Sequence, residues 1–311
     1  MKYAAKKIGM LVITVLLVSF LTFTAFQLIS GDPAETLLGT AATPERVQVL
    51  REELGLDRPF LVRYGSWLLG FLTGDLGESY SYRQPVWELV APKLASTAAL
   101  TGISFVLITL LSLPLGVLSA RVRSNVADGI RTAFNQLCMA LPPFVLGVLL
   151  SWVFGILLHR FMPGDFPSLT ADPAGALRYL FYAAVCIAVP RIAMTVRLLR
   201  SNIAGEMQKE YVLAAAARGA SPTMILRRHV LKNVLLPTVT FLGQTMAEII
   251  GAAIIVEQVF AIPGIGRFLV SSVANRDYPV VQTIVVLLAF WVVLTGTLAE
   301  LINHAVDKRL G

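Results

Sequence analysis

The sequence has little charge for its length. Only 14% of its 311 residues are Asp, Glu, Lys or Arg, whereas 56% are hydrophobic and the mean hydropathy is +0.72. A soluble protein needs about a quarter of its residues charged to cover its surface with polar groups. The shortage argues against two ordinary soluble domains and indicates a membrane protein.

Cysteine and histidine are also scarce, with 2 and 3 residues respectively. Cys138 and Cys186 both lie inside apolar runs, where cysteine packs as a small apolar residue rather than as a disulfide partner or metal ligand. His159, His229 and His304 are far apart in the sequence, which disfavours a metal or acid–base site. We therefore predict no catalytic residue, no metal site and no enzymatic activity.

Two further absences narrow the class of partner. The chain lacks the GxxxxGK[ST] loop that cradles the phosphates of ATP, so any ATP must bind to another subunit. The net charge of +7 does not gather in one stripe, as a nucleic-acid-binding face requires, but is spread between long apolar runs. We expect a lipid bilayer and no nucleic acid as the environment of this chain.

The apolar runs predict an all-α membrane protein with six transmembrane helices, because a helix needs about 20 apolar residues to cross a bilayer core. The first run, 8–29, lacks the small-residue cleavage pattern of a signal peptide and is expected to remain as a span, so that 1–30 is the N-terminus with the first span. The permease core is expected over 96–305. Its spans are predicted at 97–120, 132–158, 177–196, 233–256 and 280–305.

The distribution of charge predicts which side each end faces. Lys and Arg are concentrated at the N-terminus, in 121–131, in 197–232 and in the tail 306–311. Cytoplasmic loops carry such an excess of positive charge. We therefore predict that both termini are cytoplasmic.

Two segments outside the spans are long enough to fold. The external stretch 31–95 is longer than most structureless loops, so we expect an ordered cap of short helices, with a floppy loop as the alternative. In the cytoplasmic stretch 197–232, an alanine-rich run favours helix, Gly219 is placed to stop it, and Ser221 followed by Pro222 can start another. The expected helix–turn–helix is a docking element; the alternative is an amphipathic helix resting on lipid.

This region has a recognisable resemblance. Residues 210–237, EYVLAAAARGASPTMILRRHVLKNVLLP, resemble the cytoplasmic signature of membrane subunits of binding-protein-dependent ABC importers, in the peptide/nickel branch. Further stretches agree in order along the chain: GDPA, ELGLDRPF, GDLGESY, EQVFAIPGIGR and NRDYPVVQ. One departure is Leu213, where members of the family often have a polar or acidic residue.

The resemblance implies a bacterial plasma (inner) membrane protein that works by alternating access. Its implied partners are a second homologous permease subunit, two ATP-binding subunits that hold ATP and Mg, and an external solute-binding protein; this chain binds no cofactor itself. The coupling helix would sit in a cleft of an ATP-binding subunit. The residues implied in that coupling are Glu210, Tyr211, Ala214, Ala215, Gly219 and Ser221.

Two other groups of residues are predicted to act in transport. Glu248 and Arg191 fall within spans, where a lone charge is costly, so they mark the solute path or form a structural pair. The segment 257–278 leaves the fifth span and turns back, and forms an external gate, a docking surface or a plain connecting turn. Its candidate residues are Glu257, Pro263, Gly264 and Gly266.

The sequence favours peptides as the solute. Nickel or a metal chelate is the alternative within the same class, although nickel prefers imidazole and thiolate ligands, which are rare here. A secondary transporter is the alternative from a different class, but such proteins usually show an internal repeat or paired interrupted helices, and neither is evident.

Overall fold

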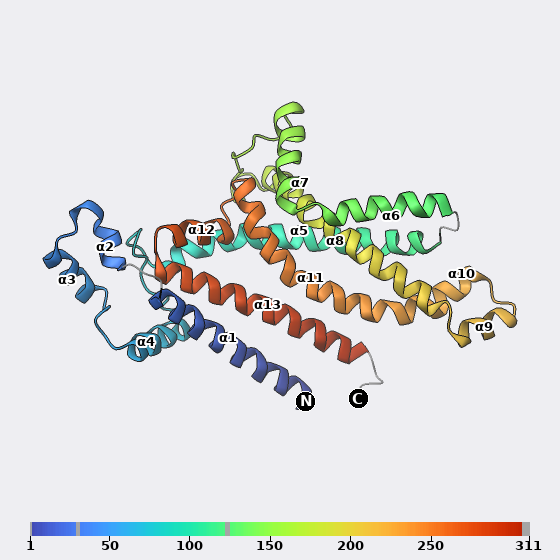
Figure 1. Cartoon of the computed structure of the whole chain (residues 1–311), viewed down its shortest axis with the longest axis horizontal. Helices are drawn as coiled ribbons and strands as arrows, with labels where there is room; N and C mark the ends of the chain where they lie inside the picture. The colour runs from blue at the N-terminus through green and yellow to red at the C-terminus, as the bar shows by residue number, and fades with distance from the viewer. Residues whose placement is uncertain (1, 29–31, 122–124, 307–311) are drawn as a thin grey trace. The chain divides into compact units, whose positions relative to one another are not determined.

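The structure is a computed structural model that describes residues 2–28, 32–121 and 125–306. Throughout these ranges the regular secondary structure is helical, apart from one isolated bridge between Glu78 and Pro85. The predicted all-α class is therefore confirmed (Figure 1). The elements are α1 Lys2–Leu28, α2 Pro33–Leu38, η1 Gly39–Ala41, α3 Pro44–Glu53, α4 Phe60–Thr73, α5 Val86–Ala120, α6 Asn125–Ala140, α7 Pro143–Leu150, η2 Ser151–Leu157, α8 Pro173–Glu206, α9 Glu210–Ala217, α10 Pro222–Ile225, η3 Leu226–Val230, α11 Leu231–Val259, α12 Ile265–Ala274 and α13 Tyr278–Val306.

Five stretches of helix are long and apolar enough to cross a membrane. They are Lys6–Ala25, Val86–Ala120, Pro173–Glu206, Pro222–Val259 and Tyr278–Leu301. Each overlaps one of the runs that the sequence predicts as a span. The stretch Pro222–Val259 also confirms that the helix after the cytoplasmic turn runs on into the fifth span.

The run expected as the third span is not one helix. It consists of α6 and a second helical piece, α7 continued by η2. The two pieces are bent by 94° at the break between them, and only together are they long and apolar enough to cross a membrane. The bend lies at Leu141-Pro142-Pro143, with Pro142 extended at ψ 143°. Proline lacks an N–H and pushes the preceding residue out of the helical region, so two in a row interrupt an otherwise apolar helix.

Two helices are longer than the sequence predicts. α5 begins at Val86, so the expected cap segment 31–95 contributes its last residues to a long helix. α8 extends on both sides of 177–196, because Asp172 caps its start by accepting from Gly175 N at 2.9 Å and its polar end continues to Glu206. The expectation followed the charge-free runs, but an occasional charged side chain does not end a helix. The rest of the cap segment forms the short helices that were expected.

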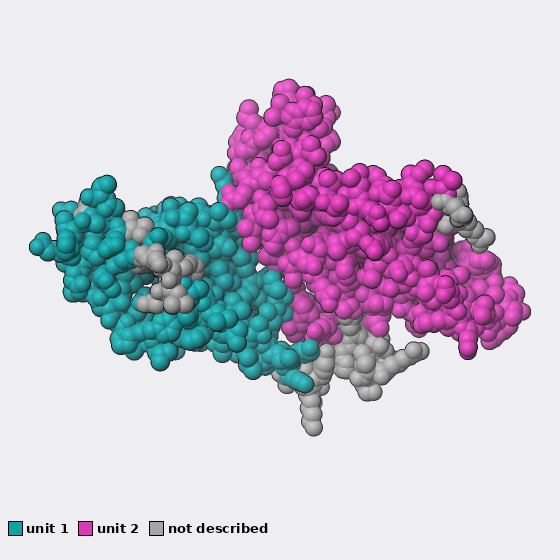
Figure 2. Space-filling view, in the orientation of Figure 1, with its two compact units in different colours: residues 1–97, 263–293 teal, residues 98–262, 294–311 magenta. Residues whose placement is uncertain are grey.

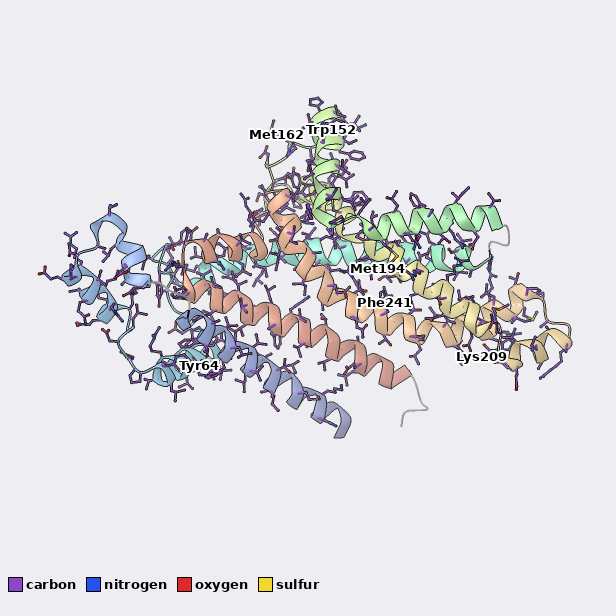
Figure 3. All side chains as sticks on the ribbon, in the orientation of Figure 1. Tyr64, Trp152, Met162, Met194, Lys209 and Phe241 are labelled. Atoms are coloured by element: carbon purple, nitrogen blue, oxygen red, sulfur yellow. The ribbon has the colours of Figure 1, made fainter. Side chains whose placement is uncertain are left out.

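The chain forms two compact units, coloured in Figure 2. Unit 1 contains Met1–Thr97 and Pro263–Val293, and unit 2 contains Ala98–Ile262 and Leu294–Gly311. In unit 1, α1 packs on α4 through aromatic rings, with the Phe23 ring 5.3 Å from Phe60 and 5.5 Å from Tyr64. Tyr64 is labelled in Figure 3, and its hydroxyl lies 2.9 Å from Ser19 Oγ. The buried apolar core of unit 1 is Leu76, Val86, Val90, Ile265, Phe268, Val280 and Ile284.

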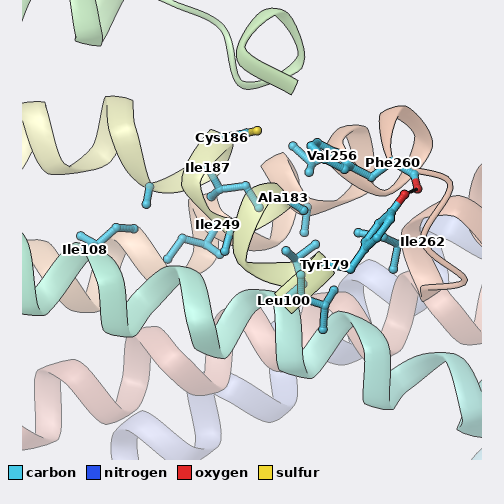
Figure 4. Packing of buried hydrophobic residues seen from close by; sticks show 14 of the residues in the cluster. Leu100, Ile108, Tyr179, Ala183, Cys186, Ile187, Ile249, Val256, Phe260 and Ile262 are labelled. Carbon is cyan, nitrogen blue, oxygen red and sulfur yellow. Dashed lines mark hydrogen bonds between the residues drawn. The ribbon is translucent and has the colours of Figure 1, made fainter. Parts of the chain in front are cut away.

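The core of unit 2 is built around α8, which contacts α6, α7 and α11. Its buried face includes the small residues Ala183, Ala184 and Ala188, which let neighbouring helices approach closely. Tyr179 Oη donates to the carbonyl of Phe260 at 2.6 Å and so joins α8 to the residue after α11 (Figure 4). Small-residue packing matters in a membrane, because lipid gives no hydrophobic drive for helix association.

Candidate functional site

The predicted helix–turn–helix is present in unit 2. α9 ends at Ala217, Gly219 has φ +85°, and the N–H groups of Gly219 and Ala220 donate to Ala216 O at 2.9 Å and Ala215 O at 3.2 Å. This left-handed stop is the geometry that favours glycine after a helix. Ser221 Oγ then accepts from Met224 N at 3.3 Å, with a proline at the first position of α10. The local structure predicted for this segment is confirmed.

A polar cluster that the sequence did not predict holds α9 in place. Glu206 Oε1 accepts from Tyr211 Oη and from Asn233 Nδ2, both at 2.9 Å, and Asn233 Nδ2 also lies 3.3 Å from Tyr211 Oη. Glu206 Oε2 pairs with Lys209 Nζ at 2.7 Å; Lys209 is labelled in Figure 3. We call Glu206, Lys209, Tyr211 and Asn233 the anchor cluster, because they join the ends of α8, α9 and α11.

The anchor cluster shields the hydroxyl of Tyr211. Burial, followed by the hydrogen bond to Glu206, raises the pKa of Tyr211 above its ordinary value of 10.0, so the neutral hydroxyl is the favoured form. The Glu206 side chain is only 11% exposed. A hydrogen bond to such a shielded carboxylate is among the stronger ones in proteins.

Apolar packing fixes the same face of α9. Val212 is buried, and Tyr211 and Ala215 pack partly buried against the same cluster. The members of this cluster are Leu199, Ile203, Val212, Ile225, Leu226, Val230 and Val234. Two of the predicted coupling residues, Tyr211 and Ala215, therefore face inward.

The opposite face of α9 is open. Glu210, Leu213, Ala214 and Ala217, spaced as one helical stripe, are exposed, and Leu213 has 64% of its surface accessible. A Cβ at Gly219 would meet no atom within 4 Å, so the turn also has open space beside it. This stripe, which we call the outward face, is a thin, mostly apolar surface with one protruding leucine.

The two predicted intramembrane charges meet. Arg191 Nη1 on α8 forms an ion pair with Glu248 Oε2 on α11, and Arg191 Nη1 also lies 3.7 Å from Met194 Sδ. The pair is not enclosed, since 48% of the Glu248 side chain is accessible in unit 2. An open carboxylate far from the ends of α11 needs water or a protein partner on its free side, because lipid offers none.

The predicted gate residues lie in different surroundings. In unit 2, Glu257 is fully buried, and its carbonyl accepts from Ile262 N at 3.0 Å just after α11 ends. In unit 1, Gly264 precedes the first residue of α12, and Gly266 is inside that helix and buried, so the chain turns before Gly266. Only Pro263 among the four is exposed.

A buried carboxylate organises the neighbouring part of unit 1. Asp277 Oδ2 accepts from Ser79 Oγ at 2.5 Å and from Ser81 N at 3.3 Å, and its Oδ1 accepts from Tyr80 N at 3.1 Å. These bonds tie the loop 77–85 to the start of α13. Burial also raises the pKa of Tyr80, and the positive charge of Arg63 opposes part of that rise. Within the described ranges, no three His, Cys, Asp or Glu side chains are grouped as a metal site.

The comparisons of this chain with known proteins point to the same family. The family described as "Binding-protein-dependent transport system inner membrane component" matches residues 112–311, and its N-terminal companion matches residues 1–101. The chain is 32% identical over 305 residues to a peptide transport system permease protein of Brucella abortus (strain 2308), covering 98% of this chain and 97% of that one.

Two further relatives are similar along their whole length. The glutathione transport system permease protein GsiC of Salmonella choleraesuis is 30% identical over 310 residues, covering 100% of this chain and 99% of the relative. The dipeptide transport system permease protein DppB of Alkalihalophilus pseudofirmus is 27% identical over 329 residues, covering 99% and 98%. Among solved structures, an inward-facing MetNI methionine ABC transporter chain shares the fold, with a TM-score of 0.56 and 23% identity over 71% of this chain and 97% of that chain.

Proposed function

Because this chain belongs to the family of binding-protein-dependent transport system inner membrane components, in its peptide/nickel branch, we propose that it carries peptides inward by ATP-driven alternating access. The observation that supports this most directly is the arrangement of α9. One face is held by the anchor cluster and apolar packing, while the outward face is free to meet another subunit.

The anchored helix suits the transfer of motion between subunits. A push on the outward face reaches α8 and α11 together, because Glu206 and Asn233 belong to those helices and both bind Tyr211. Leu213 offers exposed apolar surface whose burial against another subunit would be favourable. Coupling in this chain therefore depends on shape and apolar contact more than on a salt bridge.

The proposed assembly follows from the family. An ABC importer permease works with ATP-binding subunits, an external solute-binding protein and the lipid bilayer, and we propose that a second homologous permease subunit completes the pathway. ATP and Mg bind on the ATP-binding subunits. The outward face and both chain termini then lie on the cytoplasmic side, and α2 to α4 lie outside.

Arg191 and Glu248 are proposed to line the solute path. An ion pair that is half open within the spans can exchange its internal partner for the ammonium and carboxylate groups of a peptide. Three of the named relatives transport peptides, dipeptides or glutathione by their names, which supports a peptide as the solute here.

Two experiments test the proposal. The tagged chain should co-purify with ATP-binding subunits, and Ala214→Trp on the outward face should abolish this, whereas Ala42→Trp at an exposed site in unit 1 should not. Vesicles are then prepared with the complete complex in the membrane, the binding protein outside and ATP inside. They should take up labelled tripeptide only when ATP is present. Nickel uptake in the absence of peptide uptake, or failure to recover any ATP-binding subunit, contradicts the proposal.

A further inference from the structure

Unit 1 contains a cavity that neither α9 nor the Arg191–Glu248 pair explains. Its volume is about 520 Å³, within the range of roughly 300–1,000 Å³ that is usual for small-molecule sites. Its walls come from the end of α1, the connection from α3 to α4, α4 itself, the loop 77–85 and the start of α13. All of these belong to unit 1, so one compact body forms the walls of this open cavity.

The charges on the cavity wall are only partly paired with one another. The charged lining residues are Arg51, Arg58, Arg63 and Arg83, with Asp32, Glu53 and Glu78. Asp32 is already engaged, since its Oδ2 pairs with Arg51 Nη1 at 3.3 Å and its Oδ1 accepts from Ala34 N at 2.9 Å. Arg58 and Arg83, by contrast, form no ion pair with any residue that the structure describes. Two guanidinium groups therefore remain for a ligand.

The backbone of Arg83 has an unusual conformation at the point where its exposed side chain borders the cavity. Its φ is +54°, a left-handed conformation that glycine adopts more easily than arginine. The conformation is fixed by Arg83 N, which donates to Ser79 O at 3.0 Å, while Ser79 is itself bound to Asp277. Strained positions of this kind are concentrated at binding sites, where the surrounding structure supports them.

The remaining wall of the cavity is aromatic. Phe23, Trp67, Tyr80 and Tyr278 line the cavity. The Trp67 Nε1–H is buried and has no acceptor among the described residues, although its ring packs against Tyr64 and other aromatic rings. Because this nitrogen is buried, a ligand in the cavity does not reach it, and Trp67 offers the apolar surface of its ring instead.

We propose that this cavity binds the C-terminal carboxylate of a short peptide. Arg58 and Arg83 bind the carboxylate, since the planar guanidinium matches its two oxygens. Glu53 and Glu78 on the same wall suit the peptide's ammonium group, and the aromatic rings suit an apolar side chain. The proposal rests on the proposed function, which supplies peptides as the solute.

Binding of radiolabelled trialanine tests this inference. The complete complex is placed in nanodiscs of phosphatidylcholine without the binding protein, and affinity is measured by equilibrium dialysis. Arg58→Gln and Arg83→Gln should each weaken binding about tenfold, as loss of a charged hydrogen bond does. Trialanine amide should bind the unaltered complex about tenfold less tightly, and Arg58→Gln should weaken its binding little further.

Two more variants control for folding and for general charge. Trp67→Phe keeps an aromatic ring and removes only an N–H that the ligand does not reach, and should leave the affinity unchanged. Arg46→Gln removes an exposed arginine of α3 that does not line the cavity, and should leave the affinity unchanged. The proposal is overturned if the unaltered complex does not bind trialanine, or if the Arg58→Gln and Arg83→Gln variants bind it as tightly as the unaltered complex does.

A lipid phosphate is the competing source of an oxyanion, so the measurement is repeated with phosphatidylglycerol in the nanodiscs. If the arginine variants change retention of phosphatidylglycerol but not the affinity for trialanine, the cavity is a lipid site and the proposal is overturned. ATP-dependent peptide uptake, measured with the binding protein present, distinguishes failure of the proposed function from failure of the cavity assignment. Loss of uptake in the unaltered complex contradicts the proposed function, whereas intact uptake without trialanine binding contradicts the cavity assignment alone.

Discussion

Replacing Tyr211 with phenylalanine isolates the contribution of the anchor cluster. The ring remains in its apolar surroundings, and the change removes only the hydroxyl that binds Glu206 at 2.9 Å and lies 3.3 Å from Asn233 Nδ2. A hydrogen bond to a charged group contributes about 1.5–3 kcal/mol when it is well shielded. Because Asn233 is exposed to solvent and Glu206 keeps two other partners, we expect the loss to be about 1 kcal/mol.

A loss of about 1 kcal/mol corresponds to a factor of about five in a local opening equilibrium. Hydrogen exchange followed by mass spectrometry should therefore show amides of α9 exchanging about fivefold faster in Tyr211→Phe. ATP hydrolysis by the complex should persist while peptide uptake per ATP falls, because a loosened α9 transmits less of the motion. Tyr82→Phe is the matched control, since the Tyr82 side chain is exposed and forms no hydrogen bond with a described residue.

The outcome that refutes this reasoning is specific. If exchange in α9 is unchanged in Tyr211→Phe, apolar packing alone fixes the helix and the anchor cluster contributes nothing measurable. If exchange rises but uptake per ATP does not change, α9 is anchored as described yet does not couple ATP hydrolysis to transport.

Three further predictions address the turn, the ion pair and the buried carboxylate. Gly219→Val should abolish uptake while the chain still reaches the membrane, because valine is strained at φ +85° and would stand beside the outward face; Gly205→Val, at a helical glycine with open space around it, should be far milder. Glu248→Gln should keep assembly and ATP hydrolysis but lower peptide uptake several-fold. If the ion pair with Arg191 were only structural, the thermal stability of the complex would fall instead, and the double change with Arg191→Gln would restore that stability. Asp277→Asn should expose the loop 77–85 to protease, because an amide cannot accept all three hydrogen bonds. Cleavage elsewhere in the chain should be unchanged. If the loop resists protease as well in the variant as in the unaltered protein, Asp277 does not have the role described.

The parts of the fold that could be predicted from the sequence are those with local causes. A glycine after an alanine run, then serine and proline, specifies a helix stop and a helix start within a few residues, and the turn at Gly219 forms accordingly. The long apolar runs likewise predict where helices cross the membrane. The bend at Pro142 has an equally local cause, yet the apolar run around it obscured that signal.

The polar contacts have no local cause and could not be predicted in this way. Asp277 and Ser79 are 198 residues apart, and Glu206 and Asn233 are 27 apart. Only the fold brings such groups together. The contact of Arg191 with Glu248 is intermediate, because two charges within apolar spans indicate a pair, although the pattern does not say whether solute meets it.

The π-helical segment η3 lies between α10 and α11, and under the proposed function it affects how motion of α9 would reach α11. A π-helix holds more residues per turn than an α-helix, so such a segment contains a surplus of about one residue relative to regular winding. Rewinding it to α-geometry would rotate α11 against α10 by about 100° and shift it by about 1.5 Å along its axis. The junction therefore need not move as a rigid body. A displacement at the α10 end can produce a rotation of α11 about its own axis. Rotation changes which side chains of α11, Glu248 among them, face a given direction.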